Sequence, residues 1–179
     1  DSPMSRGLGD VYKRQVLSGP NLAREIADEK VAGTVIASKH ADLCHLGREI
    51  LSSSTFKIYT SADTQGIELA GALKNIYAII SGYCHSLDVG ENAIGLILTR
   101  SMAEMSNFAV SKGANPITFL GLAGMGDLVA TCFSKLSRNY QFGWAIGEGL
   151  DIEAAKNKVG QVAELSLIHI SEPTRHRRI

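Results

Sequence analysis

The sequence has few of the features that mark secreted, membrane-spanning or metal-binding proteins. Its three cysteines, Cys44, Cys84 and Cys132, are far apart and form no C-x-x-C pair. This spacing predicts reduced thiols in a cytoplasmic protein. The Cys44-His45 and Cys84-His85 pairs lack a further pair at ligand spacing, so we expect no metal site. No hydrophobic run approaches the roughly 18 residues of a membrane span, and no signal peptide is recognisable.

The sequence also lacks an excess of charge of either sign, with 18 basic and 18 acidic residues. Residues 1–15 and 166–179 show no periodicity related to their neighbours. Both resemble translated sequencing-adapter read-through, and we expect them to be foreign to the fold. They carry +1 and +2, so the interior has a net charge of −3. The only basic cluster, Arg175 to Arg178, is excluded with them, and we expect no nucleic-acid partner.

A dinucleotide-binding fingerprint, G-x-G-x-x-G, is absent from the whole sequence. Gly121 to Gly126 has the reverse spacing, G-x-x-G-x-G, and lies between predicted helices rather than after a strand. We interpret it as a sharp, flexible corner that brings Asp127 close to another part of the chain.

Residues 16–63 alternate short strands with helices, which predicts an α/β sheet. The expected strands are 16–18, 33–38 and 56–59, and the expected helices are 22–29, with Asn21 as N-cap, and 41–51. Three short strands are too few for a complete doubly wound domain. The pattern therefore predicts the C-terminal part of a nucleotide-binding domain, a truncated Rossmann-type sheet.

Residues 64–165 contain no strand pattern and predict an all-helical domain. Its expected helices are 66–83, 92–112 with Asn92 as cap, a short helix after Asn115-Pro116, 128–133 capped by Asp127, 138–146 capped by Ser137, and a last one from Asp151 to Gly160. In the second of these, the residues predicted to face the core are Ile94, Leu98, Met102, Met105 and Phe108.

The first helix of this domain is apolar on nearly every side, yet Lys74 and Asn75 lie in its middle. The neighbours of Lys74 at helical spacing are small: Ala70, Gly71, Ala78 and Ser81. One interpretation is a pocket beside a functional ammonium group. The other is close packing of another helix, with Lys74 extending to water.

Two further segments suggest ligand contacts. Ser137-Arg138-Asn139 places a hydroxyl, a guanidinium and an amide at a helix N-terminus, which favours an anion such as phosphate. A capped surface helix with a solvated arginine is the alternative. Gly19-Pro20-Asn21 ends a strand and opens a helix, where ligands bind in open α/β sheets.

Together these segments resemble the bacterial NAD(P)-dependent glycerol-3-phosphate dehydrogenase family from about residue 16 to 165. Seven stretches match in order and spacing. They are Leu17-Ser18-Gly19-Pro20, Glu68-Leu69-x-Gly71-Ala72-Leu73-Lys74-Asn75, Asp88-x-Gly90-x-Asn92-Ala93, Thr99-Arg100-x-Met102-Ala103-Glu104-Met105, Gly121-Leu122-Ala123-Gly124-x-Gly126-Asp127-Leu128, Leu136-Ser137-Arg138-Asn139 and Gly160-Gln161-Val162-x-Glu164.

The resemblance implies a helical domain like that of 6-phosphogluconate dehydrogenase, with Lys74 as the catalytic acid and base and Asp127 as its partner. It implies substrate contacts from Gly19, Asn21, Lys74, Asn75, Asp127, Thr131, Ser137, Arg138 and Asn139. It implies contacts with NAD or NADP from Ala23, Arg138, Val162 and Glu164. The family usually has serine or threonine where this chain has Asn21. The first half of the family's nucleotide-binding domain, which carries the glycine fingerprint, is missing.

The implied reaction is hydride transfer between NAD(P)H and dihydroxyacetone phosphate, giving sn-glycerol 3-phosphate for glycerophospholipid synthesis. We expect this chain to be an inactive fragment of such an enzyme. A related hydroxy-acid dehydrogenase and a non-catalytic helical interaction module remain alternatives. Family resemblance also suggests a homodimer, although an apolar face freed by truncation can associate non-specifically.

Overall fold

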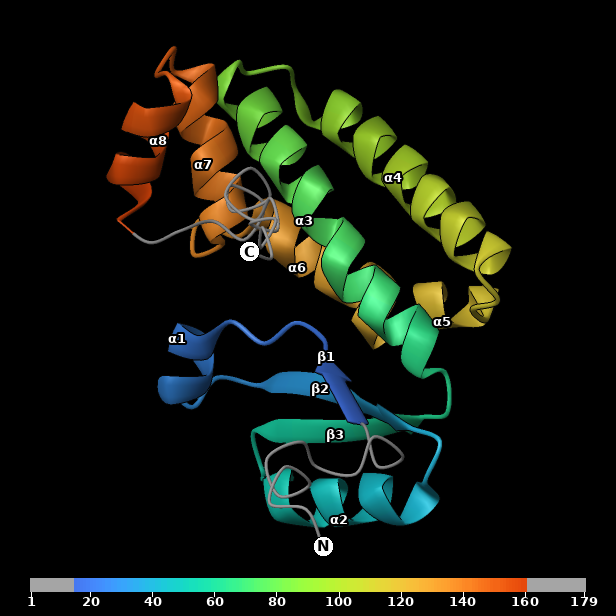
Figure 1. Cartoon of the computed structure of the whole chain (residues 1–179). Coiled ribbons are helices and arrows are strands. Elements are labelled where there is room, and N and C mark those ends of the chain that lie inside the picture. Colours follow the sequence, from blue (N-terminus) through green and yellow to red (C-terminus); the bar gives the residue numbers. More distant parts are fainter. Residues whose placement is uncertain (1–14, 161–179) are drawn as a thin grey trace, which may run out of the picture. The chain divides into compact units, whose positions relative to one another are not determined.

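The computed structural model describes residues 15–160, which form two compact units. Of the described residues, unit 1 contains 15–74 and 100–130, and unit 2 contains 75–99 and 131–160. The helices α3 (Thr64–Ser86), α4 (Glu91–Ser111) and α6 (Asp127–Phe133) each contribute to both units (Figure 1).

Unit 1 begins with a three-stranded sheet in the order β1-β2-β3, formed by Gln15–Ser18, Ala32–Ser38 and Phe56–Ser61. The strand pattern is confirmed, and helix α2 has the predicted bounds, Ala41–Leu51. β2 and β3 are parallel, whereas β1 runs antiparallel to β2, so the sheet is mixed. Figure 1 shows α2 along one face of β2 and β3. Gln15, which we expected to belong to the foreign N-terminal segment, is the first residue of β1 and pairs with Ser38 of β2.

The alternation of side chains along β2 gives the sheet two apolar faces. Val35 and Ala37 pack with Ile67 and Ala123 on one face. On the other, Ile36 packs with Cys44 of α2 and Ile58 of β3. β2 is therefore the buried centre of unit 1, and its end lies directly before the first turn of α2.

The helical part of unit 1 is fixed by one carboxylate, that of Asp63. Its oxygens accept hydrogen bonds from the Gly66 N–H at 2.8 Å, the Asn115 N–H at 3.0 Å and the Thr118 hydroxyl at 2.6 Å. Burial raises the pKa of the Asp63 carboxyl, but these three hydrogen bonds outweigh it and leave the pKa below its ordinary 3.8. Asp63 thereby joins the start of α3 to α5 (Pro116–Leu120).

The glycine-rich corner after α5 is a π-helical turn, Leu122–Gly126, which α6 continues. Ala123 and Gly124 are buried in it. Asp127 was predicted to cap α6. It is instead the first residue of that helix, and its carboxylate accepts a hydrogen bond from Lys74.

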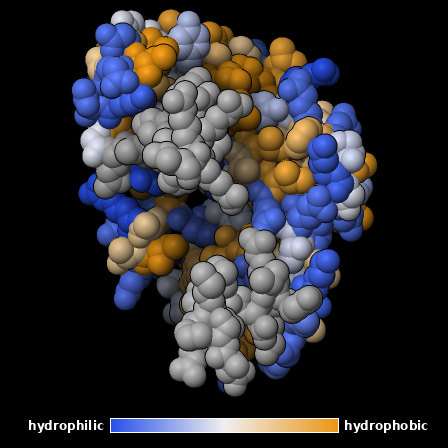
Figure 2. Space-filling model, viewed as in Figure 1, coloured by the Kyte–Doolittle hydropathy of each residue, from blue (hydrophilic) through white to orange (hydrophobic). Residues whose placement is uncertain are grey.

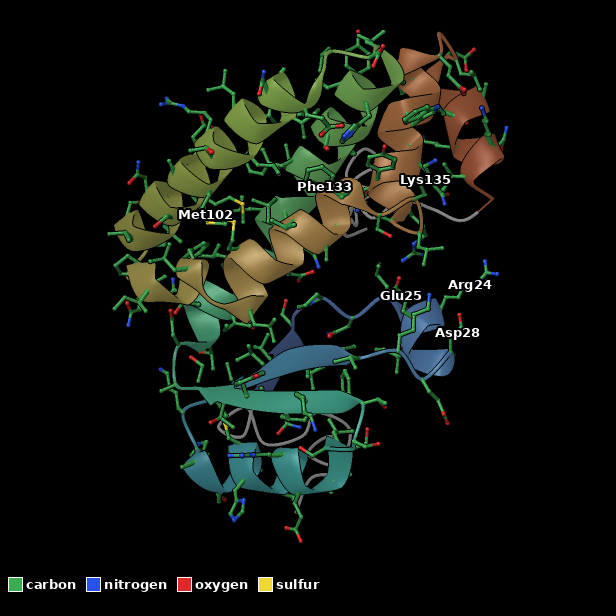
Figure 3. All side chains as sticks on the ribbon, turned by 180° about the vertical axis from the view of Figure 1, so that it is seen from behind. Arg24, Glu25, Asp28, Met102, Phe133 and Lys135 are labelled. Atoms are coloured by element: carbon green, nitrogen blue, oxygen red, sulfur yellow. The ribbon has the colours of Figure 1, made fainter. Side chains whose placement is uncertain are left out.

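Unit 2 contains α7 (Arg138–Gly147) and α8 (Ile152–Val159) together with the second half of α3. The backbones of α3 and α7 approach closely, because a Cβ at Gly143 would overlap the Ile79 carbonyl oxygen. The Ser81 hydroxyl donates to the Cys132 carbonyl oxygen at 2.8 Å. Figure 3 labels Phe133, whose ring contacts that of His85 edge-on at 5.6 Å between centroids.

Several predicted helix ends are confirmed by their hydrogen bonds. The side chains of Asn115, Ser137 and Asp151 each accept from a backbone N–H of the helix they precede. Gly160 ends α8 in the left-handed conformation, with φ of 65°. Two further caps were wrong: α4 begins at Glu91, so Asn92 lies inside it, and α1 (Ala23–Ala27) has Leu22 rather than Asn21 at its N-cap.

Burial within α4 also departs in part from the prediction. Ile94, Met102 and Met105 are buried, and Leu98 is half-buried, but Phe108 is 46% exposed. Figure 3 labels Met102 on this helix. Other large apolar side chains are exposed as well, among them Leu96 and Leu120, and Figure 2 shows exposed hydrophobic residues in orange on one face.

Within residues 15–160, no helix has the length and apolar content needed to cross a bilayer. The same residues contain no group of three or more His, Cys, Asp or Glu side chains arranged to hold a metal ion.

The crossing of α3 and α7 predicts a pair of opposite glycine effects. We expect Gly143→Ala to lower the free energy of unfolding by at least about 2 kcal/mol, because the added methyl forces the two backbones apart. Gly95→Ala in α4 is the matched control, since a Cβ there meets nothing within 4 Å. It should leave stability unchanged or raise it by up to about 1 kcal/mol, from better helix propensity. Urea unfolding measures both, and equal effects would contradict the close crossing.

Candidate active site

The centre of the candidate site is an ion pair in unit 1 between Lys74 and Asp127. The Nζ atom of Lys74 lies 2.6 Å from Oδ2 of Asp127. The Lys74 side chain is 20% exposed and that of Asp127 only 3%. The contact predicted between these two residues is therefore present, and the lysine also reaches solvent. Water access on one side of the pair is what a residue that exchanges protons requires.

The local structure explains why Asp127 lies at this point. The preceding π-helical turn directs the chain into α6, and Asp127 occupies the first turn of that helix. At this position the Lys74 ammonium group faces the Asp127 carboxylate and balances its charge.

A second donor reaches the same carboxylate oxygen. The hydroxyl of Ser18, the last residue of β1, lies 3.3 Å from Asp127 Oδ2 and donates to it. Ser18 is held in turn through its backbone, because the Thr34 hydroxyl donates to the Ser18 carbonyl oxygen at 3.1 Å. Sequence reasoning missed both residues. The available signal was the position of Ser18 at a strand end, directly before Gly19-Pro20.

Asn21 takes part in this network instead of capping α1. Its Nδ2 lies 3.0 Å from Thr34 Oγ1. The single proton of the threonine hydroxyl is used on Ser18, so Asn21 must donate and its amide orientation is fixed. Asn21 Oδ1 is then a buried acceptor with no hydrogen-bond partner among the residues that the structure describes.

The other predicted site residues of unit 1 flank this network. Gly19 is buried directly after Ser18, and Ala23 is exposed as the first residue of α1. The charged residues Arg24 and Glu25 follow on α1, and Asp28 is the C-cap of that helix, as Figure 3 shows.

Five predicted site residues belong to unit 2. Ser137 is the N-cap of α7 and accepts from the Tyr140 N–H at 3.3 Å, which leaves its hydroxyl proton able to donate to a ligand. Arg138 is exposed, whereas Asn139 and Thr131 are buried and Asn75 is half-buried. Val162 and Glu164, predicted to contact a cofactor, lie outside the described residues.

Comparison with solved structures gives the same combination of sheet and helices. The chain matches a crystal structure of glycerol-3-phosphate dehydrogenase from Coxiella burnetii with a TM-score of 0.84 and 38% identity, covering 87% of this chain and 48% of that one. It also matches the structure of DsGPDH of Dunaliella salina with a TM-score of 0.77 and 29% identity, covering 83% of this chain and 30% of that one.

Sequence comparison identifies the family. Residues 63–167 match the model described as NAD-dependent glycerol-3-phosphate dehydrogenase C-terminus, and residues 4–44 match the corresponding N-terminus model. The chain therefore belongs to the NAD-dependent glycerol-3-phosphate dehydrogenase family.

The curated relatives are enzymes of this family from bacteria. The Pseudomonas putida KT2440 protein named glycerol-3-phosphate dehydrogenase [NAD(P)+] is 58% identical over 83% of this chain and 44% of its own length. The Pseudomonas fluorescens Pf-5 protein of the same name is 56% identical over 90% of this chain and 48% of its own length. The chain thus spans about half the length of the curated relatives it matches.

The unequal burial of Lys74 and Asp127 predicts unequal costs of breaking their ion pair. We expect Lys74→Met to lower the free energy of unfolding by about 3 kcal/mol, because it leaves a buried carboxylate without its cation. Asp127→Asn should cost less, because Lys74 can extend to water. Urea unfolding at neutral pH measures both variants. A larger cost for Asp127→Asn would contradict this description of the pair.

Proposed function

We propose that this chain carries the substrate-side catalytic residues of a glycerol-3-phosphate dehydrogenase. The reaction is reduction of the carbonyl group of dihydroxyacetone phosphate to the alcohol of sn-glycerol 3-phosphate, and its reverse. The 2.6 Å contact between Lys74 Nζ and the buried Asp127 carboxylate carries the proposal. It holds an ammonium group, a proton donor, in one orientation beside a solvent-accessible space.

In this proposal Lys74 donates a proton to the carbonyl oxygen while a hydride reaches the carbonyl carbon. A C–H bond and an O–H bond form, the C=O π bond breaks, and Lys74 is left neutral until it regains a proton from solvent. Asp127 orients the ammonium group throughout. The buried Oδ1 of Asn21 can accept a hydrogen bond from a substrate hydroxyl, which would satisfy its missing partner.

The proposed phosphate contacts are Ser137, Arg138 and Asn139, at the N-terminus of α7. A guanidinium and backbone N–H groups at a helix start suit a phosphate ester better than a hydroxy acid without phosphate. Their presence favours this substrate over that of a related hydroxy-acid dehydrogenase. Gly19, Asn75 and Thr131 are proposed to contact the same substrate.

The chain has residues that can contact part of a nicotinamide dinucleotide, but not all of it. Ala23 and Arg138 are exposed, as contact with a bound molecule requires, but no glycine fingerprint is present to hold a pyrophosphate. When bound, the nicotinamide gives or takes the hydride. We therefore propose that the 179-residue chain does not turn over by itself. We place the complete enzyme in the cytoplasm, as a homodimer supplying glycerophospholipid synthesis.

The first test of the proposed function is ligand binding to this chain, measured by NMR. We expect sn-glycerol 3-phosphate to bind at least ten times more tightly than glycerol, because Arg138 contributes charge-assisted hydrogen bonds to the phosphate. Arg138→Gln should remove most of that difference. The matched control is Arg100→Gln, which removes an exposed arginine paired with Glu104 on α4.

The second arm of this test is oxidation of NADH by dihydroxyacetone phosphate. We expect none with the 179-residue chain, and turnover when the N-terminal half of a full-length relative is joined before Val16. Equal binding of the two ligands, or an equal effect of Arg100→Gln, would contradict the phosphate contacts. Turnover by the 179-residue chain would contradict its dependence on the fingerprint.

A further inference from the structure

We propose that Ser18 is a positioning residue for Lys74, acting through Asp127. Its hydroxyl keeps the Asp127 carboxylate in the orientation in which Oδ2 faces the Lys74 ammonium group. The inference rests on the proposed function for its catalytic meaning, since it assigns Ser18 a part in the orientation of the proposed acid. The contacts that support it belong to unit 1 alone.

The geometry places two donors on one carboxylate oxygen. Asp127 Oδ2 accepts from Lys74 Nζ at 2.6 Å and from Ser18 Oγ at 3.3 Å. An aspartate carboxylate can exchange its two oxygens by rotation about the Cβ–Cγ bond, and a second fixed donor restricts that rotation. The bond from Ser18 is longer than an ordinary O–H···O bond. It therefore orients the carboxylate without displacing the lysine.

Ser18 can serve as a fixed point because its backbone is anchored in the sheet. It is the last residue of β1 and is paired with Val35 of β2. Its carbonyl oxygen accepts from the Thr34 hydroxyl, which in turn accepts from Asn21. Asn21, in the loop after β1, is thus connected to the lysine of α3 by hydrogen bonds on both sides of Ser18 and by the covalent bonds of Ser18 itself.

Gly71 provides an independent observation. It lies three residues before Lys74 on α3, and a Cβ at this position would lie 3.0 Å from the Ser18 hydroxyl oxygen. Glycine therefore leaves the space that the hydroxyl occupies. An alanine at position 71 would push that oxygen by a few tenths of an ångström without removing it.

The Ser18 hydroxyl also shares the negative charge of Asp127 Oδ2. Without it, that charge acts more strongly on the ammonium group and stabilises its protonated form. We therefore expect Ser18→Ala to move the midpoint of the Lys74 titration upward by about 0.5 pH unit, a roughly threefold change in the proton affinity of the amine. A serine that served only to stabilise the fold would not change this midpoint.

The test is an NMR titration of the Lys74 side chain in the 179-residue chain labelled with ¹³C and ¹⁵N lysine. The Lys74 signal is assigned by its loss in Lys74→Arg. Ser18→Ala should shift the midpoint upward, and Ser18→Thr, which keeps a hydroxyl, should restore it. Ser53→Ala is the matched control, because its hydroxyl accepts from the Phe56 N–H in an exposed turn. It should leave the midpoint unchanged.

An unchanged midpoint in a folded Ser18→Ala chain would overturn the proposal. If that variant does not fold, Gly71→Ala decides, with an upward shift supporting the proposal and no shift overturning it. The titration requires neither cofactor nor turnover, so it is separate from the proposed function. Turnover that persists without Lys74 would overturn the function while leaving the measured coupling between Ser18 and Lys74 in place.

Discussion

The structure of unit 1 depends on an ammonium group held against a buried carboxylate, those of Lys74 and Asp127. Removing such a carboxylate from water is costly unless its charge is balanced on all sides. Here the lysine balances the charge, and the Ser18 hydroxyl donates a further hydrogen bond. The hydrogen-bonded partners are 53 and 109 residues apart in sequence, so the site forms only when β1, α3 and α6 are all in place.

Hydrogen bonds from the sheet also position the proposed catalytic lysine. β2 is buried on both faces, and Thr34 within it anchors the end of β1 through its hydroxyl. That anchor fixes Ser18, which faces the carboxylate that holds the lysine. Membership of the glycerol-3-phosphate dehydrogenase family gives this network its chemical interpretation. The helix start at Ser137 in unit 2 supplies the proposed contacts with a phosphate.

Sequence reasoning succeeded where the signal is local. The bounds of α2 and the caps Asn115 and Ser137 follow from residues within four positions of each other, whose chemistry is readable in the sequence. The prediction that Asn21 caps a helix failed, because its side chain instead donates a hydrogen bond to Thr34 on the next strand. Ser18 and the antiparallel direction of β1 were also missed, since both depend on partners chosen by the folded chain. The Lys74–Asp127 contact was predicted from family resemblance rather than from any local pattern.

The most direct test of the central claim is chemical rescue of Lys74→Ala by added primary amines. The assay uses a chain in which the N-terminal half of a full-length relative is joined before Val16, and it follows NADH oxidation by dihydroxyacetone phosphate. If Lys74 is the proton donor, the variant should lose activity and amines should restore part of it, with a rate that varies with the acidity of the added ammonium ion. Full activity without Lys74, or rescue that ignores amine acidity, would contradict the account.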